Sequence, residues 1–298
     1  MNKVIIMTDS TCDLSEQMLE EYDIKVIPLY VLFGEEQYRD LIDLKTRDLY
    51  NKVESTGIMP KTSAISPETF IKEFRKYVDQ GYDVFYTGIS SQISSTFNNA
   101  RIAAMEFPEG RVAVVDSLNL STGIGILLLK ACKFRQQGLS LLEIKTKIEN
   151  IVPRVKVSFV VKNLNYLHKG GRCSGTTKFF GTMLRIKLRI DVRDGKLLVG
   201  CKTMGVMKKA VANMTQRFID DIPNCDKDFV FITESLDAEQ SVSEIEETLR
   251  QNGVYEKFGK VFHTQAGCVI SSHCGPGTIG MLYIVKDEKD VDIPEEVE

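Results

Sequence analysis

The sequence predicts an α/β protein of two domains, the first built on a parallel sheet and the second of mixed α+β type. In the first half, apolar runs typical of strands end in polar loops, helical segments follow, and the unit repeats. Beyond Pro153 the repeat stops, and residues 183–200 alternate between apolar and polar side chains, which indicates an antiparallel hairpin. The 298 residues are 43% hydrophobic, enough for a sizeable core.

The first domain is expected to cover residues 1–150 and to consist of strand–loop–helix units. Its strands are expected at 3–10 (KVIIMTDS), 24–33 (IKVIPLYVLF), 82–90 (YDVFYTGIS) and 111–117 (RVAVVDS). Its helices are expected at 14–22, 67–80, 95–105, 122–137 and 140–150. Asp13 is the expected N-cap of the first helix because Glu16 stands at capping-box spacing, and Ser66 followed by Pro67 is expected to begin the second.

The second domain is expected to cover residues 151–298. A strand at 155–161 precedes a glycine-rich stretch, a helix through Phe179 and Phe180, and the hairpin with its turn at Asp194-Gly195. The remaining elements are expected as helix 207–219, strand 228–233, helix 238–251, strand 260–264 and a last strand at 281–285.

One face of the expected hairpin is basic and the other is apolar. The basic stripe consists of Arg185, Lys187, Arg189 and Arg193, opposite Ile186, Leu188, Ile190 and Val192. Such a stripe protects an exposed strand face from aggregation, or it serves as a docking patch for an acidic partner or an anionic membrane.

Composition excludes several classes of function. A net charge of −3 argues against nucleic-acid binding. The N-terminus does not read as a signal peptide and no apolar run is long enough to span a bilayer, so a cytoplasmic protein is expected. The seven scattered cysteines fit reduced thiols, and no cofactor motif is apparent.

Four loops at the expected carboxyl ends of strands are rich in hydroxyl side chains. They are MTDSTCD (7–13), KTSAISPET (61–69), GISSQISSTFNNA (88–100) and VDSLNLSTG (115–123). Hydroxyls and backbone N–H groups at helix N-termini suit an anion or a carboxyl group. The stretch HKGGRCSGTTK (168–178) adds a cation, because Arg172 offers a planar set of donors beside Gly170 and Gly171.

The stretch 263–281 holds two of the three histidines and two cysteines. His263, Cys268, His273 and Cys274 do not match a zinc pattern, so no metal site is expected. One interpretation makes Cys274 or Cys268 a nucleophile with His273. The favoured interpretation is that HCGPG forms a tight turn that presents His273 to a site.

In this order, the motifs resemble those of the DegV family over almost the whole chain. The matching segments are MTDSTCDL (7–14), TSAIS (62–66), ISSQISSTFNNA (89–100), VVDSLNLSTGIG (114–125), LHKGGRCS (167–174), IKLRIDVRDGK (186–196) and HCGPGTIG (273–280). The resemblance implies a Rossmann-like parallel sheet, a C-terminal α+β domain with a mixed sheet, and a lipid tunnel between them. Cys274 replaces a threonine of the family pattern.

The resemblance also implies a function. Members bind a fatty acid and present its carboxyl group to a separate ATP-binding kinase subunit, which phosphorylates it to an acyl phosphate. This chain is therefore expected to be a lipid-binding subunit, with no enzymatic activity of its own, that meets the kinase and transiently a membrane. A stand-alone Cys or Ser hydrolase, or a binder of another anionic amphipathic metabolite, remains the alternative.

Residue roles carry over from the family motifs. Thr62, Ser94 and His273 would bind the carboxyl group. The mouth facing the kinase would be formed by Arg172, Gly170, Gly171 and His168. Support would come from Asp9, Ser10 and Ser63. Candidates for the apolar lining are the helix at 123–132 and Phe97, Phe159, Phe179 and Phe180.

Overall fold

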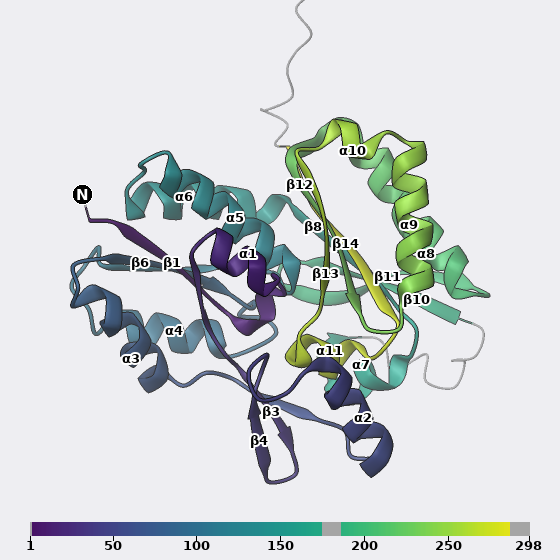
Figure 1. The fold of residues 1–298 in the computed structure, drawn as a ribbon, viewed down its shortest axis with the longest axis horizontal. Coiled ribbons are helices and arrows are strands. Elements are labelled where there is room, and N and C mark those ends of the chain that lie inside the picture. The colour runs from purple at the N-terminus through teal and green to yellow at the C-terminus, as the bar shows by residue number, and fades with distance from the viewer. Residues whose placement is uncertain (1, 175–185, 287–298) are drawn as a thin grey trace, which may run out of the picture.

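The computed structural model describes residues 2–174 and 186–286, and its first half is a three-layer α/β unit (Figure 1). A parallel sheet has the order β2 (Ile24–Ile27), β1 (Val4–Asp9), β6 (Asp83–Gly88) and β7 (Val112–Asp116). The surrounding helices are α1 (Glu16–Glu21), α2 (Thr46–Thr56), α3 (Pro67–Val78), α4 (Thr96–Ala104), α5 (Thr122–Gln136) and α6 (Leu141–Ile151). The predicted parallel sheet is confirmed.

Alternation along the strands explains the layers. On β6, Val84 and Tyr86 pack with α3 and α4, whereas Phe85 packs with α5 and α6. Because both faces of the sheet are covered, its strands are apolar on both sides, as the continuous apolar runs of the sequence indicate. The loops that leave the carboxyl ends of β1, β6 and β7 therefore gather at one edge.

The second half contains a seven-stranded mixed sheet, also as predicted. Its strands are β8 (Val155–Val161), β9 (Cys173–Ser174), β10 (Ile186–Arg193), β11 (Lys196–Met204), β12 (Cys225–Ser235), β13 (Lys260–Gln265) and β14 (Thr278–Val285). Its helices are α7 (Leu164–Gly170), α8 (Met207–Asp221), α9 (Glu239–Gln251), α10 (Val254–Lys257) and α11 (Cys268–Cys274). Positive φ angles of 49° at Asp194 and 76° at Gly195 form the predicted hairpin turn.

The two halves share a core. Helices α8 and α9 pack on one face of the seven-stranded sheet, and α5 from the first half packs on the other (Figure 1). One apolar cluster accordingly includes Ile124 and Leu127 of α5 together with Phe231 of β12 and Leu282 of β14. The domain boundary near residue 150 stays a prediction. Within the described part of the chain, no helix combines the length and the apolar character needed to cross a bilayer.

A small third sheet was not predicted. The segment 24–33, expected as one strand region, divides at Pro28 into β2 and β3 (Tyr30–Phe33). Strand β3 pairs with β4 (Glu36–Arg39) and β5 (Lys61–Ser63) in a separate antiparallel sheet. Pro28 has no N–H to continue the ladder, which ends the pairing in the parallel sheet. Helices α2, α7 and α11 were also missed.

The predicted cap of the first helix is wrong, and that of α3 is right. Ser66 Oγ accepts a hydrogen bond from Thr69 N at 3.3 Å, with Pro67 at the first helical position. Ser15, not Asp13, caps α1 by accepting from Met18 N at 3.3 Å. A 3-10 turn places Asp13 in the left-handed region (φ 52°), where its buried carboxyl bonds elsewhere.

The basic stripe on the hairpin is not an unpaired positive surface. Asp191 stands in the middle of the stripe, and its side chain is only 3% exposed. It accepts hydrogen bonds from Arg189, Arg193 and Arg217, the last reaching over from α8. The stripe therefore includes an ion-pair cluster around a buried carboxylate, which gives Arg189 a structural role. Arg185 lies outside the described residues.

Candidate functional site

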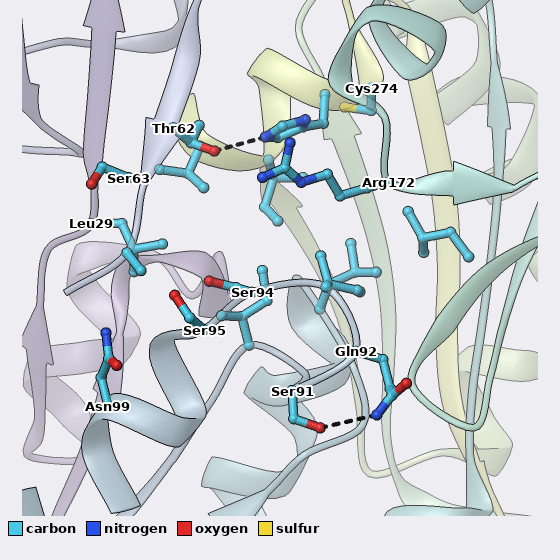
Figure 2. Close-up of a pocket in the computed structure, with 18 of the residues that line it drawn as sticks. Leu29, Thr62, Ser63, Ser91, Gln92, Ser94, Ser95, Asn99, Arg172 and Cys274 are labelled. Carbon is cyan, nitrogen blue, oxygen red and sulfur yellow. Dashed lines mark hydrogen bonds between the residues drawn. The ribbon is translucent and has the colours of Figure 1, made fainter. Parts of the chain in front are cut away.

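A cavity of about 640 Å³ lies where the loops of the first half meet α7, α11 and the seven-stranded sheet (Figure 2). Its lining is polar toward β5 and the N-termini of α3 and α4, and apolar toward the seven-stranded sheet. The apolar part includes Leu120, Phe159, Leu167, Leu197 and Ile270. The cavity therefore offers an amphipathic ligand a polar and an apolar end.

The structure brings five sequence-predicted site residues to this cavity. Thr62 lies on β5, Ser94 in the loop after β6, Arg172 just after α7, and His273 in the last turn of α11. Thr62 Oγ1 and His273 Nε2 are 2.9 Å apart, so a hydrogen bond joins two segments separated by 211 positions (Figure 2). Ser63 also lines the cavity.

His273 is held as a neutral side chain. Burial, followed by the nearby positive charge of Arg172, lowers the pKa of His273 to about 4. Its Nδ1 atom is buried, has no hydrogen-bond partner among residues 2–174 and 186–286, and faces Gly170, where an added Cβ would collide with it. With the proton on Nε2, the ring donates to Thr62 Oγ1 and leaves the Thr62 hydroxyl proton available to a ligand oxygen.

The loop that carries Ser94 is held by hydrogen bonds within the loop and by one bond to the β10–β11 turn. Ser94 N donates to Ser90 O at 3.1 Å, and Ser94 Oγ accepts from Thr96 N at 3.2 Å. Ser90 Oγ in turn donates to Gly195 O of the β10–β11 turn at 2.9 Å. The hairpin of the second half thus holds the hydroxyl-rich loop of the first half in place.

The GGR segment is the C-terminal cap of α7. Gly171 ends the helix with a φ of 66°, and the exposed Arg172 donates from Nη1 to Gly170 O at 2.7 Å. Among the described lining residues, Arg172 is the single cation. His168, Gly170 and Gly171, predicted at the mouth, lie on or next to α7 but do not line the cavity.

The predicted supporting residues lie beneath the loops. Asp9 Oδ2 accepts from Ile89 N and from Tyr86 Oη, both at 2.9 Å, and so holds the start of the loop after β6. Ser10 Oγ accepts from Leu29 N at 3.1 Å. Both side chains are fully buried and neither lines the cavity.

Two buried acids that sequence reasoning missed position the helix of His273. Asp13 Oδ1 accepts from Gly267 N and Asp40 Oδ1 from Cys268 N, each at 2.8 Å, at the start of α11. Asp13 Oδ2 also accepts from Ser121 Oγ. Burial, with a smaller contribution from the neighbouring Asp40 and Asp9, raises the pKa of Asp13 to about 8. The signal for Asp13 was its place in the MTDSTCDL motif, where it was mistaken for a cap.

The raised pKa of Asp13 predicts a pH dependence of stability. Between about pH 4, the ordinary pKa of an aspartate, and the folded-state value near 8, the folded chain holds a proton that the unfolded chain has released. This contribution to stability therefore decreases as pH rises through that window. In an Asp13→Asn variant, the side-chain amide can still bond Gly267 N and Ser121 but does not titrate. Its melting temperature should therefore change less with pH, between about pH 5 and 8, than that of the unaltered protein.

Asp237→Asn is the matched control, because that carboxyl is 50% exposed. It should keep the pH dependence of the unaltered protein. A melting temperature that depends on pH as steeply in Asp13→Asn as in the control would contradict the assignment.

The environments of Cys268 and Cys274 do not favour a role as nucleophile. Burial raises the pKa of Cys274 and of Cys268 to about 12 each, which disfavours the thiolate. His273 Nε2 is bonded to Thr62, and His263 lies against Glu234 at 3.5 Å. Over the described ranges, no group of three or more His, Cys, Asp or Glu is arranged to hold a metal ion.

Some of the residues predicted to form the apolar lining lie at the cavity, and others do not. Phe159 lines the cavity, whereas Phe97 and the helix at 123–132 are not among its described lining residues. That helix is buried in the core shared by the two halves. Phe179 and Phe180 lie outside the described residues.

Known proteins resemble this chain over nearly its full length. The model of the family described as "Uncharacterised protein, DegV family" matches residues 3–286. A DegV domain-containing protein of Clostridium acetobutylicum is 36% identical over 96% of this chain and 100% of that protein. A protein of Thermotoga maritima named fatty acid-binding protein is 34% identical over 96% of this chain and 99% of its own length.

A solved structure agrees. This structure is described as "Fatty Acid Binding of a DegV family Protein from Thermus thermophilus". Its sequence is 30% identical to that of this chain, and the two structures superpose with a TM-score of 0.87. The match covers 95% of this chain and 99% of that one. The names of the Thermotoga and Thermus proteins record fatty acid binding by those proteins.

Proposed function

This chain belongs to the DegV family, and on that premise we propose that it binds a long-chain fatty acid and presents the carboxylate to a separate ATP-dependent kinase subunit. One observation carries the proposal. A single cavity joins hydroxyl and imidazole groups at one end to an apolar interior at the other. This is the arrangement that an acyl chain with a charged head requires.

The energetics favour such a ligand. Each buried methylene gains about 0.8 kcal/mol, so a long acyl chain gains on the order of 10 kcal/mol before the cost of ordering it. A carboxylate left without partners would cost several kcal/mol. In the proposal, Thr62 and Ser94 donate to it, and the neutral His273 orients the Thr62 hydroxyl.

The kinase step is assigned to a partner. Arg172 is exposed at the rim, within electrostatic reach of His273. There its guanidinium suits a phosphoryl group that arrives at the carboxylate. The chain itself supplies binding and orientation, and it would act in the cytoplasm, where ATP and the partner are present.

Analysis of bound lipid tests the proposal. The purified protein is denatured, and the released small molecules are identified by mass spectrometry. One fatty acid per chain is expected. A protein without lipid, whose melting temperature rises with a phosphorylated metabolite but not with a fatty acid, would favour the alternative of another anionic ligand.

An Arg172→Ala variant is expected to separate the two parts of the function. Fatty acid binding should stay near that of the unaltered protein, because Arg172 is exposed and bonded to Gly170 O. Acyl phosphate formation with the kinase and ATP should fall by about tenfold. This fall corresponds to the lower end of the free energy that a hydrogen bond to a charged group contributes. Arg250→Ala, an exposed arginine on α9, is the control. Equal acyl phosphate formation by both variants would remove Arg172 from the kinase step.

A further inference from the structure

Ser90 connects three separate segments of the chain without lining the cavity. It is fully buried, whereas its neighbours Ser91 and Gln92 line the cavity. The backbone N–H of Ser90 donates to Asn119 O, in the loop after β7, at 2.9 Å. The side-chain Oγ donates to Gly195 O, in the β10–β11 turn, at 2.9 Å. Ser90 therefore bonds one loop of the first half of the chain and one turn of the second half.

Ser90 also sets the position of Ser94. The carbonyl oxygen of Ser90 accepts hydrogen bonds from Ile93 N at 3.0 Å and from Ser94 N at 3.1 Å. Its Oγ accepts from Gln92 N at 3.1 Å. These bonds fold the segment into a tight turn, from which Ser94 faces the cavity (Figure 2). A displacement of Ser90 therefore displaces Ser94.

The β10–β11 turn fits closely against the same loop. Gly195 has a φ of 76°, and a Cβ added to it would lie 2.4 Å from Ser90 Oγ. The same Cβ would lie 3.0 Å from both Gln92 Cγ and Leu118 Cδ2. Leu197, two positions after Gly195, lines the cavity as Gln92 does. The turn and the loop thus close one side of the cavity together.

We propose that Ser90 is a positioning residue for the ligand's head group. Through Ser90, the β10–β11 turn of the second half holds Ser94 where it meets the carboxylate. The inference rests on the proposed function, in which Ser94 donates to the carboxylate, and it makes that donor depend on the second half of the chain. Because coupling between sites is reciprocal, a bound carboxylate also holds the turn in place.

A double-mutant cycle tests whether Ser90 acts through Ser94. Ser90→Ala removes the bond to Gly195 O and should weaken palmitic acid binding by about tenfold, the lower range of what a hydrogen bond to a charged group contributes. In a Ser94→Ala protein the donor is already absent, so adding Ser90→Ala should cause no further loss. In a Thr62→Val protein the loss should persist, because Thr62 lies on β5 and bonds His273. Displacement of a fluorescent fatty acid measures the affinities.

Ser117→Ala is the matched control, since Ser117 is as fully buried as Ser90. Its Oγ also donates to a backbone carbonyl, Gly88 O at 2.6 Å. It also accepts from the N–H two positions on, Asn119 N at 3.0 Å. Both partners lie in the first half, so Ser117→Ala should lower the melting temperature as Ser90→Ala does but should keep the affinity for palmitic acid.

Gly195→Ala tests the same contact from the other side and decides if Ser90→Ala does not fold. Its Cβ would push the turn away from Ser90 Oγ, so palmitic acid binding should again fall by about tenfold, and by nothing further in a Ser94→Ala protein. Gly110→Ala is the control, because Gly110 has a φ of 79° and an added Cβ would meet nothing within 4 Å. It carries the backbone strain without the contact.

Hydrogen exchange of the unaltered protein tests the reciprocal effect without a variant. With palmitic acid bound, the backbone amides of the β10–β11 turn should exchange about tenfold more slowly, the factor that the coupling requires. The amides around Gly110 should not change. In Ser90→Ala this protection of the turn should be lost.

Three results would overturn the inference and leave the proposed function standing. They are equal affinity in Ser90→Ala and Ser117→Ala, a loss that adds fully to that of Ser94→Ala, and turn amides that exchange alike with and without palmitic acid. An unaltered protein that binds no palmitic acid would instead remove the proposed function, and the inference with it.

Discussion

A Thr62→Val variant is expected to bind fatty acid about tenfold to a hundredfold more weakly than the unaltered protein, because a hydrogen bond to a charged group contributes about 1.5–3 kcal/mol. Valine keeps the shape of threonine but removes the hydroxyl that lies 2.9 Å from His273 Nε2. The carboxylate would lose a donor, and His273 Nε2 would be left without its partner. Displacement of a fluorescent fatty acid measures the affinity.

Thr87→Val is the matched control for this change. Thr87 is fully buried on β6, away from the cavity, and its Oγ1 has no hydrogen-bond partner among the described residues. The same replacement there should leave fatty acid affinity unchanged and, because it removes an unsatisfied hydroxyl, should not lower the melting temperature. If Thr62→Val bound fatty acid as tightly as Thr87→Val, Thr62 would not be a head-group ligand.

A Gly170→Ala variant is expected to lower fatty acid affinity by about a hundredfold. An alanine Cβ at this position would collide with Nδ1 of His273. Relief of this overpacking, which costs about 1–3 kcal/mol, would move the ring away from Thr62 and disturb the head-group site. Binding is measured as for Thr62→Val, together with the melting temperature.

The neighbouring glycine provides the control. Gly171 has a φ of 66°, and a Cβ added to it would meet nothing within 4 Å. Gly171→Ala should therefore cost about 1–2 kcal/mol of stability through backbone strain but should keep the fatty acid affinity. Should Gly171→Ala lose as much affinity as Gly170→Ala, general disturbance of α7, and not the contact with His273, would be the cause.

Much of the site was visible in the sequence because its residues stand in recognisable loops. Parallel strands end at one edge, so hydroxyl-rich loops after β1, β6 and β7 were expected to meet, and the motif resemblance added Thr62, Ser94, Arg172 and His273. The structure brings these four residues to one cavity, and their roles stay predictions. The supports of α11 were not visible, since Asp13 and Asp40 act through backbone N–H groups more than two hundred positions away.

The sequence by itself determined the α/β class, the α+β character of the second half and the hairpin turn, because period-two alternation and strand–loop–helix repeats are local patterns. Only the tertiary structure decided that α11 is a helix, since five of the seven residues in Cys268–Cys274 are buried and show no amphipathic pattern. It alone also revealed the Thr62–His273 bond and the pairing of Arg189 with Asp191. These depend on contacts between distant segments, and spacing along a chain does not encode which packed surfaces will meet.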